Sequence, residues 1–145
     1  MMQSIRRAAF AALVVVAACK KAPPPPEPAP PPPPPPPVAV SSVEIGKAIG
    51  ADKKVTAATA VFGVRDTIYA SVATTGVSGA ATLAARWTFQ TGQLVDSTSQ
   101  AIAPTGPATT EFHITKKTAW PAGKYKVAIS LNGGAPAEKD FEVKK

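Results

Sequence analysis

The sequence predicts an all-β domain over residues 41–145, a sandwich of seven or eight short strands in two sheets. Four segments alternate apolar with polar residues, a period that puts one face of a strand in a core and the other in water. Glycine, proline and asparagine separate the segments at short intervals, and no segment has a helical period. Residues 1–40 differ in composition and predict a leader and a linker ahead of the domain.

The composition limits the kinds of site that the chain can hold. Its 145 residues include one cysteine and one histidine. A disulfide-stapled scaffold needs at least two cysteines, and a zinc or haem site needs more soft ligands than these. We therefore expect no metal and no cofactor. The net charge of +7, from 16 basic and 9 acidic residues, raises the question of a polyanionic partner.

Residues 1–18 have the features of a secretory signal peptide. Arg6 and Arg7 form a basic start, and the eleven residues 8–18 that follow carry no charge. At about 1.5 Å per residue, such a stretch spans roughly half of the ~30 Å hydrocarbon core, which is too short for a transmembrane helix. A basic start, a short apolar stretch and small residues at its end are typical of a signal that is removed on export.

The only cysteine of the chain follows at once. Val16-Ala17-Ala18-Cys19 resembles the lipobox of bacterial lipoprotein precursors. The resemblance implies cleavage between Ala18 and Cys19, a diacylglyceryl group on the Cys19 sulfur and acylation of the new amino terminus, because a thiolate is the nucleophile that can take such a group. Several acyl chains anchor a protein stably, whereas one binds a membrane only marginally. The alternative is an ordinary secretory signal with an incidental cysteine.

Lys20 bears on the destination of the exported chain. In the resembling family of bacteria with two membranes, an acidic residue after the cysteine favours retention at the inner membrane, whereas lysine is compatible with transfer to the outer membrane. The resemblance therefore implies a cell-envelope protein, lipid-anchored at the outer membrane and facing the periplasm. The chain would bind the membrane through the lipid on Cys19.

Residues 19–40 predict a proline-rich linker. Thirteen of the 17 prolines lie between Pro23 and Pro37. Proline fixes φ and lacks an N–H, which leaves polyproline II at ~3.1 Å per residue, so residues 23–37 would span roughly 46 Å. We interpret the segment as a semi-rigid spacer. The alternative is a ligand for the aromatic-lined grooves that bind such segments.

Individual strands follow from the alternation and from the turns between them. The clearest patterns cover residues 81–89, 111–115, 124–131 and 140–144. Weaker patterns predict strands over residues 43–49, 59–62, 66–74 and 94–102. The commonest architecture for strands with this spacing is a two-sheet sandwich of about a hundred residues.

Two aromatic residues carry a resemblance to immunoglobulin-like and fibronectin-III-like domains. Trp87 is at one of the alternating positions of a central strand whose side chains face the core, where such domains hold a core tryptophan. Tyr125 follows the turn 120–123 at the start of the penultimate strand, as a tyrosine corner does. The resemblance covers residues 41–145, implies the architecture and carries no activity with it.

Parity decides the register of the last hairpin. If its two strands direct their apolar residues to one face, opposing residues have numbers with an even sum, and the loop between them is odd in length. That excludes a plain two-residue turn at 132–133 and favours a three- or five-residue loop with glycine in the left-handed region, or a bulge. Lys124 and Lys126 would then lie beside Asp140 and Glu142.

Candidate catalytic residues are few. The sole histidine, His113, alternates with Phe112 and Ile114 and is expected to face solvent. Glu111 and Thr115 share its face, but residues two apart along a strand are separated by ~6.6 Å, which is too far for a catalytic contact. We therefore expect no enzyme.

Lys116, Lys117 and Trp120 form the candidate contact surface. They precede the penultimate strand, and Trp120 lies in a Pro/Gly turn rather than at a core parity. The alternative role for Trp120 is to cap the end of the sandwich. Aromatic residues do not interleave with the basic ones as a stacking platform for bases requires, so we expect no nucleic-acid partner.

Two hypotheses for function follow. In the first, the domain is the non-catalytic binding module of a membrane-anchored envelope lipoprotein, and its partner is an envelope protein or a glycan. In the second, the chain is a structural tether or an accessory subunit of an outer-membrane assembly. No small-molecule substrate is indicated, and a hydrolase with an unrecognised site is a third hypothesis.

Overall fold

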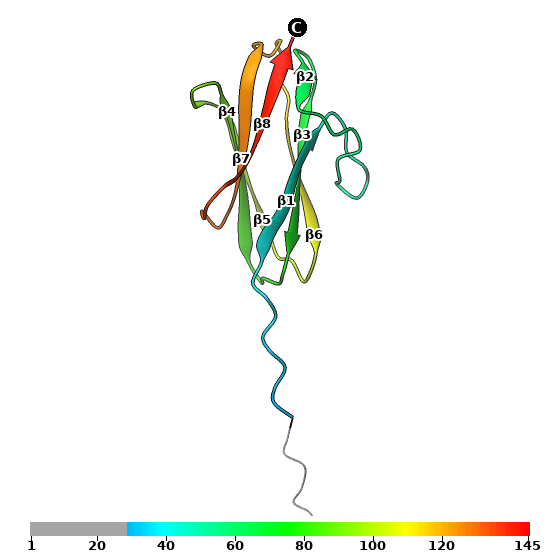
Figure 1. The fold of residues 1–145 in the computed structure, drawn as a ribbon, viewed down its shortest axis with the longest axis vertical. Coiled ribbons are helices and arrows are strands. Elements are labelled where there is room, and N and C mark those ends of the chain that lie inside the picture. The colour runs from blue at the N-terminus through cyan, green and yellow to red at the C-terminus, as the bar shows by residue number, and fades with distance from the viewer. Residues whose placement is uncertain (1–28) are drawn as a thin grey trace, which may run out of the picture. The chain divides into compact units, whose positions relative to one another are not determined.

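The structure is a computed structural model that describes residues 29–145. The predictions for the signal peptide, for cleavage after Ala18 and for lipidation of Cys19 lie outside the described residues. All eight strands belong to the unit Pro33–Lys145. They form two sheets, so the predicted all-β sandwich is confirmed (Figure 1).

The two sheets differ in size. The smaller sheet has three strands in the order β1-β3-β6, and the larger has five in the order β2-β8-β7-β4-β5. The strands are β1 (Ala39–Gly46), β2 (Val61–Gly63), β3 (Ile68–Thr75), β4 (Ala81–Phe89), β5 (Gln93–Ile102), β6 (Ala108–Ile114), β7 (Gly123–Leu131) and β8 (Ala137–Lys144). Every pairing is antiparallel except that of β2 with β8.

The chain crosses repeatedly between the sheets. Of its seven connections, only those from β4 to β5 and from β7 to β8 stay within one sheet. This Greek-key order is that of an immunoglobulin-like sandwich, in which both sheets contribute their inner faces to one core. As a result, β5 lies at the outer edge of the larger sheet and β6 at an outer edge of the smaller one.

Most observed strands match the expected ranges within a few residues, and the largest difference is at the first strand. Expected over residues 43–49, it runs instead over Ala39–Gly46, and its first residue pairs with Thr75. The sandwich therefore begins two residues ahead of the expected start at residue 41. At the other end the chain leaves the sheet, and Ile49 pairs only with Val55 in a local bridge.

Inward-facing apolar side chains fill the space between the sheets. On β4 the buried and the more exposed positions alternate along the strand, as the sequence pattern predicts. The largest side chains that are fully buried are Trp87, Phe62, Ile68, Leu83, Ile129, Val72, Val127 and Val143. Burial of this apolar surface, at roughly 25 cal/mol per Å², is the main favourable contribution to folding.

Phe141 on β8 is the centre of an aromatic cluster in this core. Its ring centroid lies 5.4 Å from that of Phe62 and 6.0 Å from that of Trp87, both edge-on. The ring of Tyr125 stacks on it at 5.3 Å. Pairs of this geometry add about 0.5–1.5 kcal/mol each to the burial of their area, so one side chain couples three strands of the larger sheet.

The two aromatic residues that suggested the architecture hold the positions expected of them. Trp87 is fully buried, although its indole Nε1 has no hydrogen-bond partner among the described residues. The hydroxyl of Tyr125 donates to the carbonyl oxygen of Pro121 at 2.8 Å, which is the bond of a tyrosine corner. Burial of Tyr125 also raises the pKa of its phenol above the ordinary value.

The hairpin of β7 and β8 has the parity that the sequence predicted. Tyr125 faces Phe141 and Lys126 faces Asp140, so the paired numbers have an even sum. Five residues separate the two strands, and within them Gly133 has a φ of 72°. The even register and the left-handed glycine in a five-residue loop are thus confirmed.

The last prolines of the linker contact the loop that joins β3 to β4. The backbone N–H of Val77 donates to the carbonyl oxygen of Pro36 at 3.1 Å, and Pro37 forms a parallel bridge with Val77. Gly76 has a φ of 89°, and a Cβ at this position would collide with the carbonyl oxygen of Pro37. Backbone contacts, rather than side chains, therefore join this end of the linker to the sandwich.

Replacing Phe141 with leucine should destabilise the domain, because the smaller side chain leaves a void among three rings. We expect the free energy of unfolding to fall by about 1–2 kcal/mol. Thermal unfolding followed by circular dichroism should show Tm lower by roughly 5–10 °C. Val61→Ala, at a side chain that is 44% exposed, is the control and should change Tm little. Equal shifts in the two variants would contradict a central role for Phe141.

Candidate functional site

A hollow of about 360 Å³ at one end of the sandwich is the candidate functional site. The β4–β5 hairpin, the end of β6 and the connection into β7 surround it. Most of its lining is apolar, from Phe89, Leu94, Val95, Ile114, Trp120, Pro121 and Tyr125. A hollow of this size and character is suited to a small ligand or to an anchoring side chain of a partner.

The hollow exists because the smaller sheet does not cover β5. Asp96 pairs with Trp87, and Gln100 pairs with Leu83, so these β5 residues share the face of buried core residues. Asp96 is nevertheless exposed and Gln100 is only half-buried. The inner face of β5 thus overhangs the edge of β6, and Leu94, which lines the hollow, is 52% exposed.

Two opposite charges stand at the rim of the hollow. Lys116 and Asp96 both line it and both are exposed. The Lys116 ammonium lies 5.8 Å from the centroid of the Trp120 ring, within the range of a cation–π contact. The hollow therefore combines an apolar floor with one cation and one carboxylate that a bound group could contact.

Trp120 is buried rather than exposed in its turn, although it does line the hollow. Its side chain is only 4% exposed, and its indole Nε1 donates to the carbonyl oxygen of Asp66 at 2.9 Å. The backbone N–H of Trp120 donates to the carbonyl oxygen of Val64 at 2.7 Å, and its ring packs edge-on against Tyr125. The alternative expectation, that Trp120 caps the end of the sandwich, is confirmed. Its neighbours Lys116 and Lys117 remain exposed.

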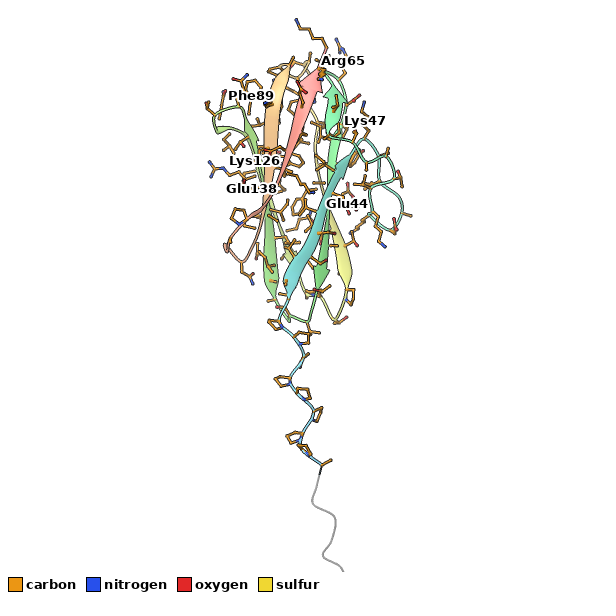
Figure 2. All side chains as sticks on the ribbon, in the orientation of Figure 1. Glu44, Lys47, Arg65, Phe89, Lys126 and Glu138 are labelled. Atoms are coloured by element: carbon orange, nitrogen blue, oxygen red, sulfur yellow. The ribbon has the colours of Figure 1, made fainter. Side chains whose placement is uncertain are left out.

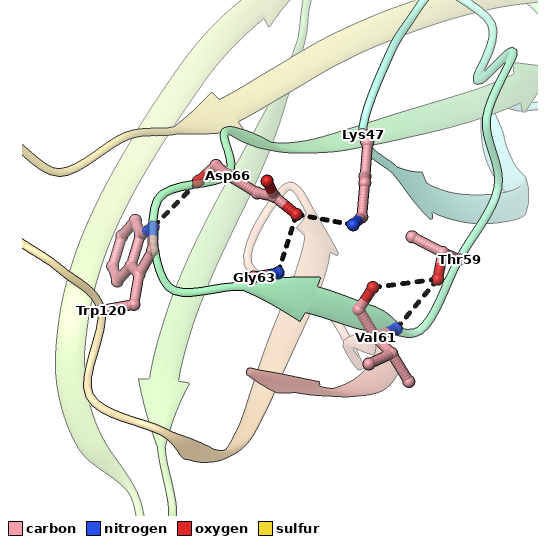
Figure 3. A network of polar contacts seen from close by, with 6 residues as sticks. All are labelled: Lys47, Thr59, Val61, Gly63, Asp66 and Trp120. Atoms are coloured by element: carbon pink, nitrogen blue, oxygen red, sulfur yellow. Dashed lines mark hydrogen bonds and ion pairs between the residues drawn. The ribbon is translucent and has the colours of Figure 1, made fainter. Parts of the chain in front are cut away.

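Asp66 organises the polar contacts behind this cap (Figure 3). One oxygen of its carboxylate accepts the backbone N–H of Gly63 at 2.7 Å and pairs with the Lys47 ammonium at 2.7 Å. Its carbonyl oxygen accepts the Trp120 indole N–H. Asp66 thus joins the end of β1, the turn between β2 and β3, and the residue that closes the sandwich.

These contacts lower the pKa of the Asp66 carboxyl below its ordinary value. The largest cause is the hydrogen bond from Lys47, followed by the backbone N–H of Gly63, and both favour the ionised form. Since the pKa is lowered in the folded state, ionised Asp66 stabilises the fold above the pKa that it has in the unfolded chain. This contribution disappears as the pH falls through the folded-state pKa.

Lys126 of β7 is paired with acids of β8, as expected for a solvated sheet face. The Lys126 ammonium lies 2.7 Å from a carboxylate oxygen of Glu138 and 4.0 Å from one of Asp140 (Figure 2). The bond with Glu138 is the main cause that raises the pKa of Lys126. Lys124 faces Glu142 across the strands, but the carboxylate of Glu142 lies 3.3 Å from the Lys144 ammonium. The acids of β8 thus neutralise part of the positive charge on this face.

His113 faces solvent as expected, but it does contact Glu111. The side chain is 54% exposed, and its Nδ1 lies 3.0 Å from a carboxylate oxygen of Glu111. The expectation that residues two apart are too far for contact is wrong, because the two long side chains lean toward each other and bridge the separation of their Cα atoms. The hydroxyl of Ser78, between two glycines, donates to the carbonyl oxygen of Ala80, as a turn residue does.

The residues that build this end of the molecule carry little signal in the sequence. Residues 47–60 fold back on themselves through backbone bonds such as that from the N–H of Lys47 to the carbonyl oxygen of Ala57. This places Lys47 beside Asp66, about twenty positions away in sequence. The only local signal was an aspartate three residues after Gly63, which is a common turn composition.

The described part of the chain holds neither a candidate metal site nor a candidate membrane-spanning helix. No group of three or more histidine, cysteine, aspartate or glutamate side chains within residues 29–145 is arranged to hold a metal ion. In the same range, no helix has the length and apolar character of a membrane span.

No family model matches the chain, and no curated protein matches it. Among solved structures, a β-glucosidase from Erythrobacter marinus is 8% identical with a TM-score of 0.52; the match covers 74% of this chain and 15% of that one. The C-terminal domain of wzt is 9% identical with a TM-score of 0.51, and the match covers 74% of each chain. The chain therefore spans a small part of the glucosidase, and these similarities show the β-sandwich fold alone.

Replacing Asp66 with asparagine should lower the free energy of unfolding by about 1 kcal/mol near pH 7, after allowance for the partial exposure of the ion pair. The difference from the wild type should shrink as the pH falls below about 4, because protonation removes the same charge from the wild type. Thermal unfolding between pH 7 and pH 3 measures it. Asp140→Asn, at a side chain that is 82% exposed, is the control. A difference that stays constant with pH would contradict the ionic contribution.

Proposed function

We propose that this protein is a lipid-anchored component of the bacterial cell envelope whose sandwich is a non-catalytic binding module. In this proposal the mature chain begins at a lipidated Cys19, is held at the outer membrane on the periplasmic side, and binds an envelope protein or a glycan. The observation that carries the binding role is the apolar hollow beside the overhanging β5 strand.

The anchor is supported by the arrangement of the amino-terminal sequence. A basic start, a short uncharged stretch and the motif Val16-Ala17-Ala18-Cys19 follow one another in the order of a lipoprotein precursor. The proline-rich segment begins four residues after the cysteine. A polyproline II spacer of ~3.1 Å per residue would give the sandwich reach beyond the lipid surface.

The character of the hollow supports binding rather than catalysis. Its exposed polar groups, Lys116 and Asp96, are suited to orient a bound group at the rim of an apolar floor. His113 and its partner Glu111 line a different hollow, together with Lys53, Thr98 and Gln100. The one histidine is thus separate from the candidate site.

A structural tether is the second candidate function. The observation that favours it is the set of backbone contacts between Pro36–Pro37 and Gly76–Val77. A linker that ends in a fixed contact holds its domain more firmly than one that ends in a flexible joint. A spacer that positions a subunit of an outer-membrane assembly would use this property.

Replacing Cys19 with alanine should abolish lipidation, because alanine has no sulfur to take the diacylglyceryl group. Cells grown with a radioactive fatty acid should label the wild-type chain and leave the variant unlabelled. The variant should appear as an unprocessed precursor or be released from the membrane. An unlabelled wild-type chain would refute the anchor.

A photo-crosslinking amino acid at position 116 tests the hollow in living cells. We expect it to give a defined adduct with an envelope component, since this side chain lines the hollow. The same amino acid at position 117, which is exposed but does not line the hollow, is the matched control and should give little of that adduct. Equal adducts from both positions would contradict a binding site in the hollow.

A further inference from the structure

We propose that the free edge of β5 pairs with β5 of a second copy of this chain, which joins two larger sheets into one. β5 has ten residues and is the longest strand of the domain. It is also the outermost strand of the larger sheet, so one of its two edges faces away from β4. An edge of this length offers a row of backbone donors and acceptors to another strand.

The hydrogen bonds of β4 show which backbone groups of β5 point outward. The carbonyl oxygen of Thr82 on β4 accepts the backbone N–H of Asn132, and the backbone N–H of Thr82 donates to the side-chain oxygen of Asn132, both at 2.8 Å. The backbone N–H and C=O of Thr82 therefore point toward β7. Successive residues of an antiparallel strand direct these groups to alternate sides, so the backbone groups of the odd-numbered β4 residues point toward β5. They are paired with the even-numbered residues of β5. Ser97, Ser99 and Ala101 therefore direct their N–H and C=O groups to the free edge.

Most of these outward groups lack a partner. The N–H of Ser97 is occupied, because it donates to a carboxylate oxygen of Asp96 at 2.8 Å. Within residues 29–145, the outward groups of Ser99 and Ala101 bond to no other backbone group. The open part of the edge is thus centred on Ser99.

The other three edges are short or partly occupied. β2 has only three residues. On β6, the carbonyl oxygen of Glu111 accepts a bond from the side chain of Gln100 at 2.6 Å. On β1, the carbonyl oxygen of Ile45 accepts the N–H of Thr59 at 3.1 Å, and a register shift interrupts the strand near Ser41.

β5 carries few of the features that commonly prevent such pairing. Its sequence from Gln93 to Ile102 contains no proline and no lysine. Proteins protect exposed edges with such residues, with inward-pointing charges and with bulges. β5 has one inward charge, Asp96, and a register shift beside it at Val95. The rest of the strand, from Ser97 to Ile102, has none of these features, which favours a second strand there.

The occupied and open groups select one register. With a two-fold axis through Ser99, the two copies of Ser99 exchange both backbone bonds, and the N–H of Ala101 donates to the carbonyl oxygen of Ser97 in the second copy. In this register the Ser97 N–H keeps its hydrogen bond with the Asp96 carboxylate of the same chain. It also places Asp96 opposite Ile102 rather than opposite another acid, so no like charges meet.

The proline-rich segment of a second copy is excluded as the occupant, because proline has no N–H to donate to a strand edge. Pairing along one strand covers less surface than the ~800 Å² per partner of a typical stable complex. The pair should therefore be weak in dilute solution and form when copies are concentrated on one surface. To that extent the inference rests on the proposed membrane anchor.

Cysteine crosslinking of the full chain in isolated membranes tests the pair. Ser97, Ser99 and Ala101 are each replaced with cysteine, and mild oxidation is followed by non-reducing electrophoresis. In the proposed register the two copies of residue 99 have Cα atoms about 5.5 Å apart, within disulfide range, whereas copies of residue 97 or 101 are offset by ~13 Å. We expect a disulfide-linked homodimer from Ser99→Cys and much less from the other two.

Thr82→Cys, at an exposed position on β4, which is paired on both sides, and the wild-type chain with Cys19 alone are the controls. In a second variant, Ala101→Pro is added to Ser99→Cys. It removes an outward N–H without breaking the β4 ladder, so the homodimer should fall about fivefold while Tm is retained.

Three results would overturn the pairing: no excess of Ser99→Cys over Thr82→Cys, equal yields along β5, or disulfides from residue 99 to a different protein. Fatty-acid labelling of the same membranes reports on the anchor separately. A labelled chain without the homodimer refutes the pairing and leaves the proposed function intact, whereas an unlabelled chain refutes the anchor whatever the crosslink.

Discussion

The sandwich depends on the burial of alternating apolar side chains between two sheets, because Cys19 is the only cysteine and no disulfide can join strands of the domain. Trp87 shows how strongly burial dominates. Its buried Nε1 has no hydrogen-bond partner within residues 29–145, which costs about 1–3 kcal/mol. Removing 150–250 Å² of indole surface from water contributes roughly 4–6 kcal/mol, so the ring remains inside despite the unpaired donor.

The unequal number of strands in the two sheets explains both the hollow and the free edge of β5. A sheet of five strands facing a sheet of three must leave part of its inner face uncovered. The uncovered part is β5, whose inner positions Asp96 and Gln100 are polar where a covered strand would be apolar. The overhang forms one wall of the hollow, and the same strand presents the free edge. One asymmetry of the fold thus exposes both the inner face of β5 and its outer edge.

The sequence predicted the elements that obey a local period. The strands around Trp87, Tyr125 and Phe141 were recognised because alternation records which face of each is buried. The hollow was not predicted, since the overhang of β5 depends on which strand faces which, and this is not a local property. The ion pair of Asp66 with Lys47 was not predicted for the same reason, because the two side chains meet only where residues 47–60 fold back. The burial of Trp120 could not be predicted for the same reason, because its partner, the carbonyl oxygen of Asp66, is 54 positions away.

The join between linker and sandwich constrains the chain in a way that composition alone does not show. A proline-rich spacer tolerates many substitutions, because polyproline II has no internal hydrogen bonds to lose. Its last residues are different: Pro36 accepts a backbone bond from Val77, and the carbonyl of Pro37 occupies the space that a Cβ on Gly76 would need. Gly76 is also left-handed, with a φ of 89°, so two independent requirements exclude other residues there. The backbone contact of Pro36 and Pro37 with the sandwich therefore depends on a glycine in the β3–β4 loop rather than on the prolines alone.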